Sequence, residues 1–190
     1  MKTVLFVPGF RESIDSRDYK STLEAIKNKG YSVKFVPIEW TRTTIEDWTK
    51  ELDVEYSKHD PANTILAGFS YGSLTAFMSA TKHNPAELWL FSFSPYFADD
   101  IPKMKKSWLK EIGKYRADAF SKLEFNELAR YIKCKTQIVV GEKEIKKYPL
   151  IGNRSTVASN EIKNSHMTIV DGSDHDVTDK RYITAIEQLI

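Results

Sequence analysis

The sequence has a single cysteine, no long apolar run and almost no excess of either charge. Because Cys134 has no partner for a disulfide within the chain, we expect a reducing compartment and a cytoplasmic location. No apolar stretch approaches the roughly 20 residues that span a membrane, and residues 4–7 are too short for a signal-peptide core. A net charge of +2 gives no basis for binding nucleic acid or a membrane surface, so we expect neither partner.

The chain of 190 residues alternates short apolar runs with amphipathic segments. This alternation predicts one α/β domain over residues 1–190, a three-layer α/β/α sandwich with a mostly parallel sheet covered on both faces. An expected helix covers residues 15–29, another opens at a capping-box pattern from Thr43 to Glu46, and a closing helix covers 179–190. The expected strands cover residues 3–7, 31–38, 63–67, 87–93, 136–140 and 166–170.

The most informative stretch is the apolar run 64–67 followed by Gly68-Phe69-Ser70-Tyr71-Gly72 and an amphipathic segment. This pattern predicts a strand, a very tight turn and a helix. A serine at such a turn stands above the end of the sheet, and the two glycines avoid collisions with the neighbouring backbone. The following helix directs its N-terminus at Ser70, which favours negative charge developing there.

A serine hydroxyl needs a neighbouring base before it can act as a nucleophile. His175 lies in the polar loop 171–176, after the last expected strand. In a parallel sheet this places it at the same edge as Ser70. We therefore predict that His175 is the base. The other histidines lie in a polar loop, at a helix end and at a strand start, respectively His59, His83 and His166.

The base needs an acid to orient it, and Gly141-Glu142-Lys143-Glu144 follows the fifth expected strand. We predict Glu144 as this acid and keep Glu142 as the alternative. Other carboxylates near strand ends are weaker candidates. Asp99 and Asp100 follow the fourth expected strand, and Asp174 and Asp176 flank His175 itself.

The order Ser70, Glu144, His175, with Gly-x-Ser-x-Gly at a strand-to-helix turn, resembles the α/β-hydrolase superfamily, in particular its small, capless intracellular serine hydrolases and esterases. The resemblance covers nearly the whole chain and implies a minimal six-stranded fold with strand order 2-1-3-4-5-6. It also implies an oxyanion hole formed by the backbone amides of Phe10 and Tyr71. Pro8-Gly9-Phe10 replaces the His-Gly pair of larger relatives, and glutamate replaces the commoner aspartate.

The expected activity is hydrolysis of a small-molecule acyl substrate, a carboxylic ester or thioester, through an acyl-enzyme on Ser70. This reaction needs no metal or organic cofactor, and no metal-ligand spacing occurs in the sequence. Two alternatives remain: a non-catalytic binding protein on a hydrolase scaffold, and a hydrolase-fold lyase that uses the same residues. The oligomeric state stays open.

Residues near the strand ends are expected to line a moderately apolar substrate site. The candidates are Arg11, Trp40, Tyr96 and Phe97, beside Phe10 and Tyr71. Arg11 and Arg42 either meet an acidic group of the substrate or lie in solvent. The lysine-rich stretch 96–133 is longer than a plain crossover. It predicts a short helical insertion, either a solvated helical face or a mobile flap that attracts acidic substrates.

Overall fold

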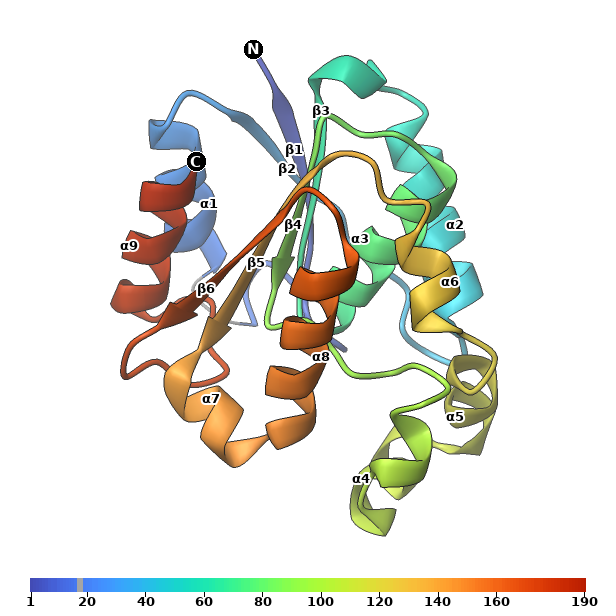
Figure 1. The fold of residues 1–190 in the computed structure, drawn as a ribbon. Coiled ribbons are helices and arrows are strands. Elements are labelled where there is room, and N and C mark those ends of the chain that lie inside the picture. Colours follow the sequence, from blue (N-terminus) through green and yellow to red (C-terminus); the bar gives the residue numbers. More distant parts are fainter. Residues whose placement is uncertain (17–18) are drawn as a thin grey trace.

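The computed structural model describes residues 1–16 and 19–190, and its centre is a six-stranded sheet. All strand pairs are parallel, and the order is β2-β1-β3-β4-β5-β6, as predicted. Helices cover both faces of the sheet (Figure 1). The strands are β1 (Thr3–Val7), β2 (Ser32–Phe35), β3 (Thr64–Phe69), β4 (Glu87–Phe91), β5 (Lys135–Gly141) and β6 (Ser165–Val170).

Two helices, α1 and α9, cover one face, and most of the others lie on the opposite face or beyond the sheet's edge (Figure 1). The predicted helix 15–29 is found from residue 19 onward, and its residues 17–18 lie outside the described residues. The helices are α1 (Tyr19–Asn28), α2 (Ile45–Tyr56), α3 (Tyr71–Lys82), α4 (Lys106–Ile112), α5 (Lys114–Phe120), α6 (Phe125–Ala129), α7 (Glu142–Lys147), α8 (Pro149–Glu161) and α9 (Lys180–Leu189), with short 3₁₀ turns η1 (Pro61–Asn63) and η2 (Ile101–Lys103).

The start of α2 corrects one sequence prediction by a single residue. The N-cap is Thr44, whose backbone N–H donates to the Asp47 carboxylate at 3.0 Å, so the capping box is Thr44 to Asp47 rather than Thr43 to Glu46. Thr43 instead accepts a hydrogen bond from the indole N–H of Trp48 at 2.8 Å. The capping box therefore begins at Thr44, and the Thr43 hydroxyl is used to bond Trp48, which is buried in the core.

The predicted insertion, residues 96–133, contains η2, α4, α5 and α6. Helices α4 and α5 extend beyond the sheet, at the edge where the strands end (Figure 1). Two arginines tie the insertion to the rest of the domain. Arg154 on α8 contacts Asp100 at 2.8 Å and Asp99 at 2.7 Å, and Arg116 on α5 donates to the carbonyl of Trp40 at 2.6 Å. The insertion is thus held to the domain near its start and at α5. Among the described residues, no helix is long and apolar enough to cross a membrane.

Candidate active site

The turn between β3 and α3 holds Ser70 in a backbone conformation that side chains rarely adopt, with φ of +56° and ψ of −119°. The flanking glycines make this turn possible. A Cβ at Gly68 would overlap the backbone of Gly72, and a Cβ at Gly72 would overlap the carbonyl oxygen of Val7. The close packing of β1, β3 and α3 therefore accounts for both glycines, and it leaves Ser70 exposed to the cavity described below.

Ser70, His175 and Glu144 come from three separate strand ends and form one chain of hydrogen bonds. The Ser70 Oγ lies 3.1 Å from His175 Nε2, and His175 Nδ1 lies 2.6 Å from Glu144 Oε1. The His175 side chain is 24% exposed, whereas that of Glu144 is fully buried. In the tautomer that carries its proton on Nδ1 and donates it to the carboxylate, Nε2 is an acceptor toward the serine hydroxyl.

Three donors hold the Glu144 carboxylate in place. Besides His175, the backbone N–H of Gly141 donates to Glu144 Oε2 at 3.1 Å, and the Ser92 hydroxyl donates to the same oxygen at 2.8 Å. A glutamate at the third position of α7 thus folds back onto the N-terminus of its own helix and still reaches the imidazole.

Glu142, the alternative acid, has different partners. Its carboxylate accepts the backbone N–H of Gly172 at 3.0 Å and contacts the ammonium of Lys146. The Lys146 hydrogen bond, followed by that of Gly172, lowers the pKa of Glu142 to about 2. The structure therefore places Glu144, and not Glu142, against His175.

Ser92 is a site residue that the sequence did not reveal. It follows β4 with φ of +52°, and it is fully buried. Its hydroxyl lies 3.2 Å from that of Tyr182, which donates to the Val139 carbonyl at 2.6 Å. Burial raises the pKa of Tyr182 well above its usual value, so this phenol stays neutral. No motif marks Ser92, because its role depends on β4 and β5 being neighbours.

The loop after β1 lies on the other side of Ser70. The Gly9 N–H donates to the Tyr19 hydroxyl at 3.1 Å and to the Glu12 carboxylate at 3.2 Å, and Glu12 also accepts a hydrogen bond from the Tyr19 hydroxyl. The rings of Phe10 and Tyr71 stack with centroids 4.8 Å apart. These contacts fix the loop beside the N-terminus of α3, where backbone amides favour an anion.

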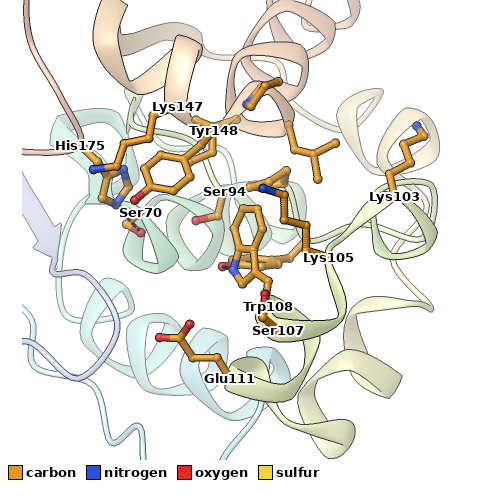
Figure 2. A pocket seen from close by; sticks show the side chains of 15 residues that line it. Ser70, Ser94, Lys103, Lys105, Ser107, Trp108, Glu111, Lys147, Tyr148 and His175 are labelled. Carbon is orange, nitrogen blue, oxygen red and sulfur yellow. Dashed lines mark hydrogen bonds between the residues drawn. The ribbon is translucent and has the colours of Figure 1, made fainter.

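Two cavities meet at Ser70 and His175. The larger has a volume of about 690 Å³, and the smaller, of about 230 Å³, includes Gly9, Phe10, Glu12 and Tyr71. Both include Tyr96, Trp108 and Glu111. Figure 2 shows the larger one, with Ser70 and His175 at one side and Trp108 with Lys105 at the other. The remaining lining residues of the larger cavity are Ser94, Pro95, Lys103, Ser107, Lys147, Tyr148, Pro149, Leu150 and Ile151.

The predicted lining residues divide between cavity and core. Tyr96 lines both cavities. Phe97 and Trp40 correct the prediction: Phe97 is fully buried against Phe77 and Phe125, and Trp40 is buried against Phe10 and Trp48. Neither lines either of these two cavities, because both side chains belong to the buried apolar cluster.

Arg11, the other predicted lining residue, is also absent from both cavity walls. It has φ of +59°, and its guanidinium carbon lies 5.0 Å from the centroid of the Phe10 ring. Sequence reasoning in turn missed Trp108, Glu111 and Tyr148. The length of the insertion was the only signal for the first two, which lie on α4. The Trp108 indole N–H donates to the Tyr96 hydroxyl at 3.2 Å, so the insertion forms part of the cavity wall.

No group of three or more histidine, cysteine or acidic side chains that could hold a metal ion occurs among residues 1–16 and 19–190.

No protein-family model and no curated protein matches the sequence. Solved structures do match its fold. Est1E from Butyrivibrio proteoclasticus with ferulic acid bound superposes with a TM-score of 0.82 at 13% identity, over 100% of this chain and 88% of that one. The ydeN gene product of B. subtilis gives 0.73 at 14% identity, over 100% and 96%. Dienelactone hydrolase from Anabaena variabilis gives 0.69 at 16% identity, over 100% and 83%. The chain has a compact α/β-hydrolase fold.

Proposed function

We propose that this α/β-hydrolase-fold protein is a serine hydrolase that cleaves small carboxylic esters or thioesters through an acyl-enzyme on Ser70. One observation carries the proposal: the unbroken chain from Ser70 through His175 to the buried Glu144, opening onto a cavity. A binding protein would have no need for a strained serine aligned with a histidine and a buried carboxylate.

The reaction begins when His175 Nε2 takes the Ser70 proton as Oγ attacks the acyl carbon. Glu144 keeps Nδ1 protonated and stabilises the imidazolium that forms. His175 then returns the proton to the leaving alcohol or thiol, and Ser70 holds the acyl group. Water attacks this acyl-enzyme with His175 again as the base, which releases the carboxylic acid and restores Ser70.

The negative charge on the tetrahedral intermediate needs donors beside Ser70. We assign this role to the backbone amides of Phe10 and Tyr71. Both residues border the smaller cavity together with Ser70, and Tyr71 is the first residue of α3. The first amides of a helix have no partner within it, so the Tyr71 amide is available to an oxyanion. Losing one such donor typically costs about 10²- to 10³-fold in rate.

The larger cavity favours a small substrate with a planar apolar part. Its volume of about 690 Å³ suits a ligand of a few rings at most, and Tyr96, Trp108 and Tyr148 supply aromatic walls. The neighbour Est1E, whose structure holds ferulic acid, supports this choice by analogy. Aryl and arylalkyl esters are therefore the first substrates to assay.

A fluorophosphonate probe tests the proposal, because it labels only an activated serine. We expect wild-type protein to be labelled with one equivalent, and Ser70→Ala to be unlabelled while keeping the wild-type circular dichroism spectrum. Absence of labelling in the wild type would favour the binding-protein alternative. Product analysis separates hydrolysis from a lyase reaction, since only hydrolysis yields an acid with an alcohol or thiol.

A further inference from the structure

The larger cavity carries an uneven distribution of charge. Its wall includes three lysines, Lys103, Lys105 and Lys147, and one carboxylate, Glu111. Glu111 also lines the smaller cavity, as do Tyr71 and Ser70. Lysines thus outnumber carboxylates in the wall of the larger cavity, and one of them, Lys147, lies beside His175 (Figure 2). Such an excess of positive charge favours an anionic ligand.

Two of the three lysines already have carboxylate partners. Lys103 lies 3.9 Å from Asp99, and its amine is turned away from the cavity in Figure 2. Lys147 lies 3.4 Å from Asp174, and its ammonium lies 5.2 Å from the centroid of the Tyr148 ring. Lys105 forms no ion pair with any carboxylate in the described part of the chain.

Lys105 is also placed to meet a ligand that passes the aromatic walls. Figure 2 shows its side chain extending alongside the Trp108 ring, with Ser70 and His175 on the far side of the cavity and Tyr148 between. A planar group lying against Trp108 and Tyr148, with its ester carbonyl at Ser70, would direct its other end toward Lys105. The Trp108 ring is fixed for this contact by its hydrogen bond to Tyr96.

We propose that the larger cavity takes aromatic esters bearing a second, free carboxylate remote from the scissile bond, and that Lys105 binds this carboxylate. The hydrolysis of these esters rests on the proposed function, whereas the contact between Lys105 and the carboxylate does not. Because Lys105 is exposed, the ion pair is screened by water, and its contribution corresponds to about a three- to fivefold preference. Added salt weakens it.

The test compares each carboxylate with its neutral carboxamide. One pair carries the group in the acyl part: the 4-nitrophenyl esters of 3-(4-carboxyphenyl)propanoic acid and of its 4-carbamoyl analogue. The other pair carries it in the alcohol part: the acetate esters of 3-(4-hydroxyphenyl)propanoate and of its amide. We expect kcat/KM to favour the carboxylate by about three- to fivefold in at least one pair at low salt, and this preference to vanish in Lys105→Gln.

Lys106→Gln is the matched control. Lys106 is the next residue along the chain and carries the same charge, but its side chain lines neither cavity. It should keep the wild-type preference. Equal use of both members of each pair, or the same loss in both lysine variants, would overturn the inference.

Binding separates this inference from the proposed function. In Ser70→Ala protein, the intact esters are titrated and followed by tryptophan fluorescence, with and without Lys105→Gln. Tighter binding of the carboxylate that depends on Lys105 supports the inference even if wild-type protein hydrolyses nothing, in which case only the proposed function fails. Hydrolysis without any such preference leaves the esterase standing and removes the role of Lys105.

Discussion

Removing the Ser92 hydroxyl should weaken catalysis without disturbing the fold. This hydroxyl donates to Glu144 Oε2 at 2.8 Å, and both residues are fully buried, so no bulk water replaces the lost donor. A hydrogen bond to a charged group contributes about 1.5–3 kcal/mol. If all of it acts on the carboxylate that supports the imidazolium, kcat falls by about 10- to 160-fold. We expect Ser92→Ala to lie in the lower half of this range, because Gly141 still holds the same oxygen.

The matched variant is Ser92→Gly, which also lacks the hydroxyl but suits the positive φ of +52° at this position. Alanine keeps the backbone strain and glycine relieves about 1 kcal/mol of it. The two variants should therefore lose kcat equally, while the glycine variant melts at the higher temperature. The assay is steady-state kinetics with a 4-nitrophenyl ester, beside thermal unfolding. Wild-type kcat in either variant, or a loss confined to KM, would refute the reasoning.

Three further predictions concern the acid, the turn and a surface cluster. Glu144→Gln should lower kcat by about 10³- to 10⁴-fold, whereas Glu142→Gln should change it by less than about threefold; the reverse order in steady-state kinetics would move the acid to Glu142. Gly72→Ala should yield little soluble protein, because its Cβ would overlap the Val7 carbonyl, and normal expression with activity would contradict this packing. Hydrogen bonds from Lys34, Lys58 and His59 lower the pKa of Glu55 from 4.5 to about 2. The stability they provide, about 1 kcal/mol, is therefore present above pH 4.5 and lost as the pH falls toward 2; urea unfolding of Glu55→Gln should show a smaller loss over that range.

The arrangement of the strands could be predicted from the sequence. Each apolar run ends at a proline, glycine or polar loop, and parallel crossovers leave few topologies, so the strand order and the shared edge of Ser70, Glu144 and His175 followed from pattern and resemblance. Gly68 and Gly72 predicted the tight turn, because a Cβ at either position would overlap neighbouring backbone atoms.

The directions of individual side chains could be predicted less well from the sequence. Tyr96 and Phe97 are adjacent after β4, yet Tyr96 faces the cavity and Phe97 the core, a difference that depends on how the insertion packs. Trp108 lies on α4, and no local sequence pattern predicts where this helix packs relative to the sheet. Ser92 contacts Glu144 across 52 residues of chain. Such contacts depend on tertiary packing, which periodicity does not report.

The central claim is that Ser70 becomes acylated, and the most direct test is the mass of the protein during turnover. Excess 4-nitrophenyl ester is mixed with the enzyme, the reaction is quenched in acid within the first turnover, and the digested protein is searched for the acylated peptide. We predict a burst of nitrophenol and an added acyl mass on the peptide that contains Ser70, both absent in Ser70→Ala. Turnover without any acyl mass on Ser70, or an equal burst from Ser70→Ala, would contradict this claim.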